Sequence, residues 1–195
     1  MALEATPATR WQPLTGGTAI WVFMSVEVLT FGLFFLGHAW GWRSEPVAFA
    51  ESQALLHPAS AARGTVILLL GSWFAYQAVL SNAVRRHRAT ASWLWAAAAA
   101  GVLFGANKIA EYRSPDLTDV TLSTNAFWFS YLFLTGLHLL HVLLGVVILG
   151  YLAVMAGRRV YGPDNALEVE AGAAYWHLVD LIWVLLFPIL YLMHP

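Results

Sequence analysis

Five long, continuously apolar stretches are the feature that most constrains how this 195-residue chain can fold. A membrane-spanning helix needs about 20 consecutive apolar residues, and a backbone surrounded by lipid must satisfy its own hydrogen bonds. Because the stretches are continuous rather than alternating, they predict helices and not the strands of a β-barrel. We therefore predict an all-α integral membrane protein, a bundle of five spans at residues 18–40, 65–83, 92–110, 126–155 and 172–193.

Composition supports this fold class. Only 11% of the residues are charged, against about 25% in soluble domains. The formal net charge is −1, so no basic surface indicates a nucleic-acid partner. The chain has no cysteine, which excludes disulfides, thiolate metal sites and cysteine nucleophiles.

Basic residues predict the orientation. By the positive-inside rule, the side that holds more of them faces the cytoplasm. We therefore place residues 1–17 in a cytoplasmic tail, residues 18–195 in one membrane domain and the carboxyl terminus in the periplasm of a bacterial inner membrane. Arg85, Arg86 and Arg88 are interpreted as a topology signal that contacts lipid headgroups. The basic residues on the predicted cytoplasmic side are Arg10, Arg85, Arg86, Arg88, Arg158 and Arg159.

Ionisable residues within the spans are the candidates for chemistry. A charge at mid-membrane costs roughly 2.5–3.5 kcal/mol on insertion scales, so each such residue needs a partner. Six of the seven form i,i+3 pairs, and the two members of such a pair share one helix face. The seven are Glu27, Lys108, Glu111, His138, His141, His177 and Asp180.

Depth along the spans divides these residues into two groups. From a rise of 1.5 Å per residue, Glu27 and Asp180 lie about 14 and 12 Å from the inner edge. His138, His141 and His177 fall near the same layer, so we predict one buried polar network of these five residues. The network could instead bind a metal ion or relay protons, but it has few carboxylates for a di-metal site, and we predict no metal.

Lys108 and Glu111 fall close to the outer boundary of the membrane. We interpret them as an outer ion pair whose side chains can extend to the headgroups. On this interpretation, removing either residue should matter less than removing Glu27. In the same span, Gly101 and Gly105 are four residues apart, a spacing that favours close packing on another helix.

Several sequence blocks resemble haem-copper oxidase subunit III. They occur in that family's order and together cover nearly the whole chain from about Trp11. The blocks are Trp21-Val-Phe-Met-Ser-Val-Glu27, Glu111-Tyr112, Thr135-Gly-Leu-His138-Leu-Leu-His141-Val-Leu-Leu-Gly145 and Tyr175-Trp-His177-Leu-Val-Asp180-Leu-Ile-Trp183.

The resemblance implies an accessory role without a catalytic residue or a cofactor of the chain's own. Haem, with copper or non-haem iron, would belong to a catalytic partner subunit in the membrane. Bound phospholipid is implied as well. Carried over, Glu27 is the family's buried carboxyl group, with His138 or His141 as its partner.

Two segments indicate a particular branch of the family. Phe49–His57 and Val184–Leu192 look most like NorE, the subunit-III-like protein of bacterial nitric oxide reductase clusters. Subunit III of a cytochrome c or quinol oxidase is the alternative, and the sequence leaves the electron donor open. More remote hypotheses are an intramembrane metal-dependent oxidoreductase and a proton-coupled transporter.

Overall fold

A computed structural model describes residues 17–193, so almost all of the predicted tail, including Arg10, lies outside the described residues. Within this range the chain is helical, and the only β-type pairing is an isolated bridge between Gly162 and Asn165. The elements are α1 (Gly17–Ser44), α2 (Pro46–Gln53), α3 (Pro58–Ala83), α4 (His87–Tyr112), the 3-10 helix η1 (Pro115–Leu117), α5 (Ala126–Gly157) and α6 (Leu167–Tyr191).

The prediction of five spanning helices is confirmed. α1, α3, α4, α5 and α6 are each long and apolar enough to cross a membrane. The helices extend beyond the apolar stretches, most clearly at the starts of α3 and α6. The extra turns contain charged residues, such as Arg63 in α3 and Glu168 and Glu170 in α6, which interrupt the apolar pattern on which the prediction relied.

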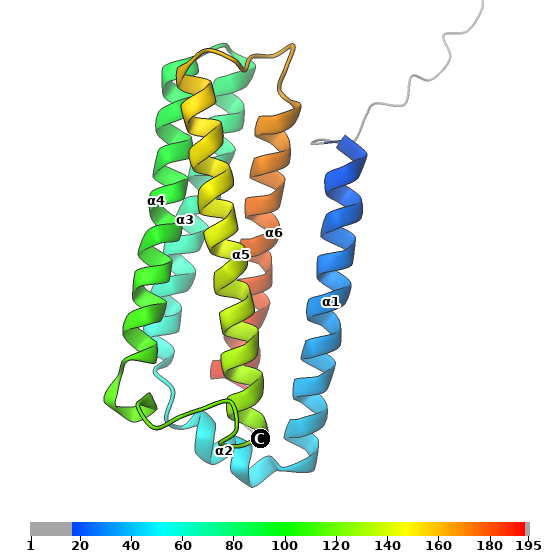
Figure 1. Ribbon diagram of the computed structural model, residues 1–195, viewed down its shortest axis with the longest axis vertical. Coiled ribbons are helices and arrows are strands. Elements are labelled where there is room, and N and C mark those ends of the chain that lie inside the picture. Colours follow the sequence, from blue (N-terminus) through cyan, green and yellow to red (C-terminus); the bar gives the residue numbers. More distant parts are fainter. Residues whose placement is uncertain (1–16, 194–195) are drawn as a thin grey trace, which may run out of the picture.

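α2 is a short helix that the sequence did not predict. Proline occupies its first turn, where a missing N–H costs nothing. The helix lies across one end of the bundle (Figure 1). Gln53 Nε2 donates to the Leu190 carbonyl at 3.0 Å, and Asn125 Nδ2 donates to Ser52 Oγ at 2.9 Å. α2 therefore fastens the ends of α5 and α6 together.

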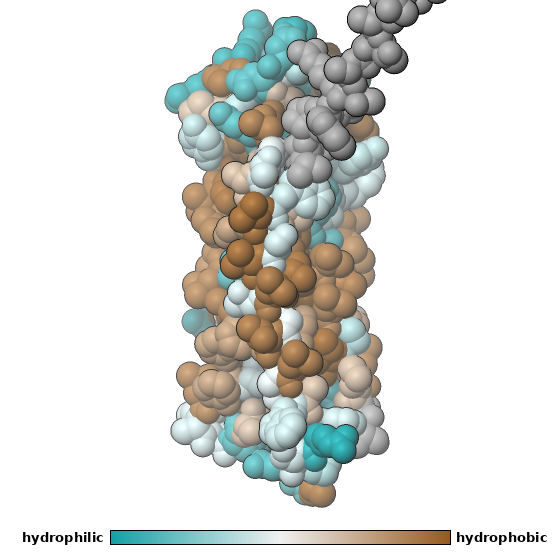
Figure 2. Space-filling model, turned by 90° about the vertical axis from the view of Figure 1, so that its right-hand side faces the viewer, coloured by the Kyte–Doolittle hydropathy of each residue, from teal (hydrophilic) through white to brown (hydrophobic). Residues whose placement is uncertain are grey.

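α3, α4, α5 and α6 form a four-helix bundle, and α1 stands to one side of it (Figure 1). α1 packs against α5 and α6, but only Phe31 and His38 of this helix are buried. Seen from the α1 side, the surface has a hydrophobic band between hydrophilic ends (Figure 2). This pattern is typical of a protein surrounded by lipid.

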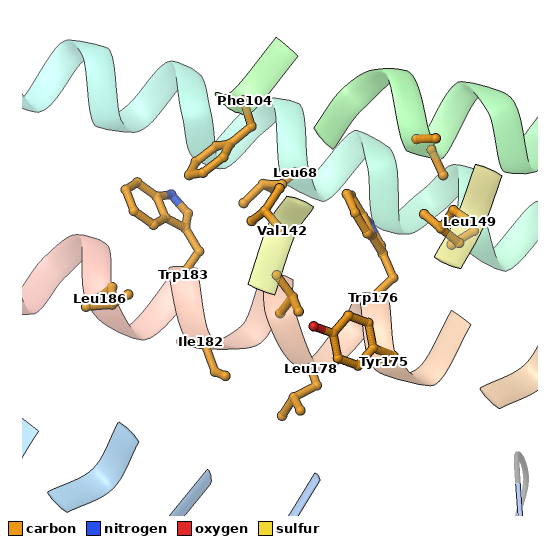
Figure 3. Close-up of a cluster of buried hydrophobic side chains, with 14 of the residues drawn as sticks. Leu68, Phe104, Val142, Leu149, Tyr175, Trp176, Leu178, Ile182, Trp183 and Leu186 are labelled. Carbon is orange, nitrogen blue, oxygen red and sulfur yellow. The ribbon is translucent and has the colours of Figure 1, made fainter. Parts of the chain in front are cut away.

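The centre of the bundle is organised around Trp176, which points from α6 into the core with Trp183 (Figure 3). Glycines of three other helices line the indole of Trp176. A Cβ atom at Gly71, Gly101 or Gly145 would lie 3.1, 2.7 or 2.9 Å from this ring. A residue larger than glycine would therefore crowd the tryptophan where α3, α4 and α5 approach it.

Gly101 and Gly105, which were predicted to pack closely on another helix, are both buried, but Gly101 has the tighter surroundings. A Cβ atom at Gly101 would also lie 2.5 Å from Val146 Cγ2 on α5. At Gly105 the nearest atom, Leu139 Cδ1, is 3.7 Å away, which is an ordinary contact. The two glycines face different neighbours, and only the first is sterically constrained.

Candidate functional site

Lys108 and Glu111 form an ion pair in the interior of the bundle. Lys108 Nζ lies 3.1 Å from Glu111 Oε1, and the two side chains are 1% and 0% exposed. The pairing was predicted, but the expectation that it reaches the headgroups is wrong. Depth along a helix does not fix which way a residue faces, and this face of α4 is covered by α5 and α6.

Two tyrosines complete this cluster, which we call the lysine cluster (Lys108, Glu111, Tyr131 and Tyr191). Lys108 Nζ donates to the hydroxyls of Tyr131, at 3.1 Å, and Tyr191. Both hydroxyls in turn donate to Glu111 Oε1, Tyr131 at 2.7 Å. The three ammonium protons thus have three acceptors, and Oε1 accepts three hydrogen bonds. This arrangement fits an ammonium paired with a carboxylate.

Aromatic rings surround the ammonium of Lys108. Its Nζ atom lies 4.8–5.3 Å from the centres of the rings of Tyr112, Tyr131, Trp183 and Tyr191. A cation–π contact stabilises the cation by about 0.5–1 kcal/mol at an exposed site and by about 2 kcal/mol or more where water is excluded. The cluster therefore offsets part of the cost of burying the charge.

Glu27 and His141 form a second acid–base pair, between α1 and α5. Glu27 Oε2 lies 3.2 Å from His141 Nε2, and each side chain is 16% exposed. His141 was one of the two partners predicted for Glu27. His138, the other, does not reach it.

The protonation of this pair follows from its hydrogen bonds. His141 Nδ1 lies 2.8 Å from the Leu137 carbonyl, which can only accept, so Nδ1 carries a proton. A hydrogen bond between His141 Nε2 and the Glu27 carboxyl requires one further proton, carried either by Nε2 or by the carboxyl. The pair is therefore either imidazolium with carboxylate or neutral imidazole with neutral carboxyl.

Asp180 and His177 lie apart from Glu27 and His141. Asp180 Oδ2 accepts a hydrogen bond of 2.7 Å from Ser72 Oγ, which joins α6 to α3. His177 is exposed on the surface of α6. The prediction of a single five-residue network is therefore wrong, because residues at one depth are distributed around the circumference of the bundle.

His138 is completely buried among aromatic side chains. Its ring stacks on Trp183 at 5.1 Å and meets the edge of Phe104 at 5.5 Å. Within the described residues, neither ring nitrogen has a hydrogen-bond partner. His138 therefore serves as a packing residue of the core, between Trp183 and Phe104.

The arginines of the α3–α4 turn were predicted to contact headgroups. Arg85 adopts a left-handed conformation, with φ of 57°, and its guanidinium pairs with Asp164 in the α5–α6 connection. Arg85 therefore also links two connections of the protein. In the same connection, burial raises the pKa of the Tyr161 phenol, with a further contribution from nearby Glu168. Headgroup contacts of Arg86 and Arg88 remain predictions.

No group of three or more His, Cys, Asp or Glu side chains in residues 17–193 is arranged as a set of metal ligands. In this part of the chain the acidic and imidazole side chains occur singly or in pairs, such as Glu27 with His141.

A family profile described as cytochrome c oxidase subunit III matches residues 18–194. The chain belongs to this family. Together with the five apolar helices, the match identifies a multi-pass bacterial membrane protein.

Individual relatives of this subunit-III-family chain differ in how much of their length it spans. A heme-copper oxidase subunit I+III of Aeropyrum pernix is 30% identical over 182 residues, or 90% of this chain but 22% of the relative. A cytochrome c oxidase subunit 3 of Thermostichus vulcanus is 32% identical over 132 residues, or 66% of this chain and 63% of the relative. A probable quinol oxidase subunit 3 of Staphylococcus saprophyticus is 25% identical over 172 residues, or 88% and 86%.

Sequence reasoning missed the tyrosines of the lysine cluster. Tyr191 lies near the end of the last span, where tyrosine is typical of an interfacial anchor, and no pattern in the sequence singled out Tyr131. One signal was available: a lysine within an apolar helix needs several acceptors, and Glu111 alone cannot supply three. Hydroxyl groups on neighbouring helices were therefore required.

Proposed function

We propose that this chain is a non-catalytic subunit III of a haem-copper-family respiratory oxidase in a bacterial membrane. The observation that carries the proposal is the family match over residues 18–194, since it includes all five spanning helices. The relatives in Thermostichus and Staphylococcus carry the names of cytochrome c oxidase and quinol oxidase subunits 3.

The proposed partner is a catalytic membrane subunit that contains the haem and the second metal. The Aeropyrum relative is named as a subunit I+III, so one polypeptide there combines a subunit-III region with a subunit I. Because fusion holds two subunits side by side, it supports a subunit I as the partner of a separate subunit III. In this chain the ionisable side chains of two membrane pairs contact each other: Lys108 contacts Glu111, and Glu27 contacts His141. We assign them a bracing role.

We further propose that lipid acyl chains occupy the apolar cavities beside α1. One cavity of about 750 Å³ is lined by residues of α1, α5 and α6, among them Ile20, Phe23 and Leu144. Another of about 360 Å³ lies where α1 meets α2, with Phe35, Trp42 and Phe49 in its wall. Apolar walls that open to the lipid-facing surface suit hydrocarbon chains.

A nitric oxide reductase is the second candidate partner, supported by the NorE-like segments Phe49–His57 and Val184–Leu192. These two segments meet in the fold, where Gln53 donates its hydrogen bond to Leu190. The two segments therefore contact each other at one end of the molecule, and we propose that the partner subunit is recognised there.

Co-purification tests the proposal. The tagged chain is isolated from its own membranes in mild detergent, and its companions are identified by mass spectrometry and by their haem spectrum. We expect a haem-bearing catalytic subunit. A copper-bearing subunit II indicates an oxygen-reducing oxidase, and a nitric oxide reductase large subunit indicates the NorE branch.

Glu27→Ala provides the accompanying variant. We expect less of the companion subunit, or faster loss of its turnover, with an unchanged haem spectrum, because α1 loses its pairing with α5. A chain that purifies alone, or that carries a haem or a stoichiometric metal ion ligated only by its own residues, would overturn the proposal.

A further inference from the structure

A third cavity lies between α1, α2 and α5, and the proposals above do not use it. Its volume is about 440 Å³, which is within the range of small-molecule sites. Two of its lining residues carry polar side chains, His38 of α1 and Ser130 of α5, and the others are aliphatic, aromatic or glycine. The cavity therefore presents one polar pair in an otherwise apolar wall.

The hydrogen bonds of Ser130 determine which ring nitrogen of His38 carries the proton. Ser130 Oγ donates to the Phe127 carbonyl at 2.9 Å, and a hydroxyl has only one proton to donate. The contact of 2.8 Å between Ser130 Oγ and His38 Nδ1 therefore uses a proton on Nδ1. A neutral imidazole that donates through Nδ1 has a lone pair on Nε2. His38 thus offers an acceptor at Nε2.

This acceptor has no donor within residues 17–193. Unlike both ring nitrogens of His138, however, Nε2 of His38 is not sealed in the protein interior. His38 as a whole is only 7% exposed, and it lines this cavity as well as the cavity of about 360 Å³ beside α2. A ligand that filled the space and left Nε2 without a donor would lose about 1–3 kcal/mol. The site therefore favours a ligand that brings a donor.

Aromatic rings form much of the wall around this acceptor. Phe34 and Phe133 meet edge to face with their ring centres 4.9 Å apart, and Phe129 stacks on Phe133 at 5.8 Å. The ring of Phe49 lies 5.3 Å from that of His38. A further aromatic ring gains about 0.5–1.5 kcal/mol from such a partner beyond the burial of its area. The cavity between α1, α5 and α6, by contrast, has mainly aliphatic walls.

The cavity opens to the lipid-facing surface. Two of its lining residues, Leu33 of α1 and Phe129 of α5, are 69% and 52% exposed. His38 precedes Ser44, the last residue of α1, by six residues, or about 9 Å along the helix axis. A molecule dissolved in the bilayer can therefore enter from the side, with its polar group near the end of the span and its apolar part in the hydrocarbon.

We propose that this site binds the reduced form of a membrane quinone, with a phenolic O–H of the quinol donating to His38 Nε2 and the quinol ring packed among the phenylalanines. The oxidised quinone has carbonyl groups in place of the hydroxyls, and a carbonyl cannot donate to a lone pair. The site therefore distinguishes the two forms by one hydrogen bond. Binding involves no electron transfer.

Calorimetric titration of the full chain in lipid nanodiscs, without oxygen, tests the proposal. The probes are a benzoquinol, the corresponding benzoquinone and the dimethyl ether of the quinol, all with the same alkyl tail. We expect the quinol to bind about tenfold more tightly than the other two, because only the quinol donates a hydrogen bond. Equal affinities for the three probes, or no binding of the quinol, would overturn the proposal.

His38→Phe keeps a ring at this position but removes the acceptor. The variant should lose the preference for the quinol over its dimethyl ether. His177→Phe is the matched control, because it replaces an exposed histidine of α6 that does not line the cavity, and it should keep the full preference. A preference that survives in His38→Phe would show that another group reads the hydroxyl, which contradicts the proposal.

Two measurements on the unaltered chain decide the question even if His38→Phe fails to fold. In nitrogen-15 spectra of the histidine-labelled chain, the quinol should shift the unprotonated nitrogen of His38, whose signals are assigned by their response to Ser130→Ala. No shift would refute the contact with Nε2. An alkanol of equal tail length should bind more weakly than the quinol, and equal binding would refute an aromatic ligand. These outcomes do not depend on which oxidase the chain accompanies.

Discussion

α4 and α1 are both strongly apolar helices, yet they occupy opposite situations in the fold. In its most apolar 18-residue window, 44% of α4 is buried within the protein, whereas the figure for α1 is 6%. α4 carries a fully buried ion pair, whereas α1 contributes Glu27 to an acid–base pair with His141 of α5, in which each side chain is 16% exposed. Hydropathy reports that a helix lies in the membrane, and packing reports whether lipid or protein surrounds it.

The contrast matters because lipid resembles an apolar side chain as a solvent. Burying a leucine from lipid against protein gains no hydrophobic free energy, so association depends on close packing and polar contacts. α4 has both, at Gly101 and in the lysine cluster. α1 has mainly the contact of Glu27 with His141 and that of His38 with Ser130.

Lys108→Met should have the largest effect. It leaves the buried Glu111 without its cation, and removal of one partner from a buried pair costs about 3–5 kcal/mol. The measurement is the free energy of unfolding in mixed micelles titrated with a denaturing detergent. The control is Lys108→Met combined with Glu111→Leu, which should recover much of the loss because no unpaired charge remains. A loss no greater than that of Glu27→Gln would contradict the contrast between the two helices.

Gly101→Ala should follow, with a loss of about 1–3 kcal/mol from overpacking against Val146 and Trp176. Gly105→Ala is the matched control on the same helix, since its Cβ atom meets only Leu139 at 3.7 Å. The same unfolding titration measures both variants. Equal losses of stability at Gly101 and Gly105 would mean that the contacts of Gly101 with Val146 and Trp176 do not account for the loss.

Glu27→Gln should cost less, about 0.6 kcal/mol and no more than about 1.7, as is typical of polar contacts between membrane helices. A double-mutant cycle with His141→Leu isolates the contact between the two side chains. A coupling energy near zero would remove the bracing role that we assign to this pair.

Leu29→Ala should have the smallest effect, within about 0.5 kcal/mol, because Leu29 of α1 is 69% exposed. Leu68→Ala, at a fully buried position of α3, is the matched control and should leave a destabilising cavity. If Leu29→Ala leaves stability unchanged but reduces co-purification of the catalytic subunit, this face of α1 contacts the partner.

The sequence predicted the spans well because a hydrocarbon environment restricts the backbone to helices. It also predicted the pairing of Lys108 with Glu111 from their i,i+3 spacing, and for Glu27 it left His138 and His141 as alternative partners, of which the structure has His141. It placed Lys108 at the membrane boundary, since rise per residue measures depth alone. It merged Asp180 and His177 with Glu27 for the same reason. α2 was missed because a short helix outside the membrane has no long apolar stretch.

The sequence by itself therefore determined the environment of this protein, the number of its spanning helices and its membership of the subunit III family. Only the tertiary structure decided which side chains meet: Tyr131 and Tyr191 on Lys108, three glycines on Trp176, and Ser130 on His38. The physical reason is that the membrane constrains each helix separately along its axis, whereas rotation about that axis is set by packing against the other helices.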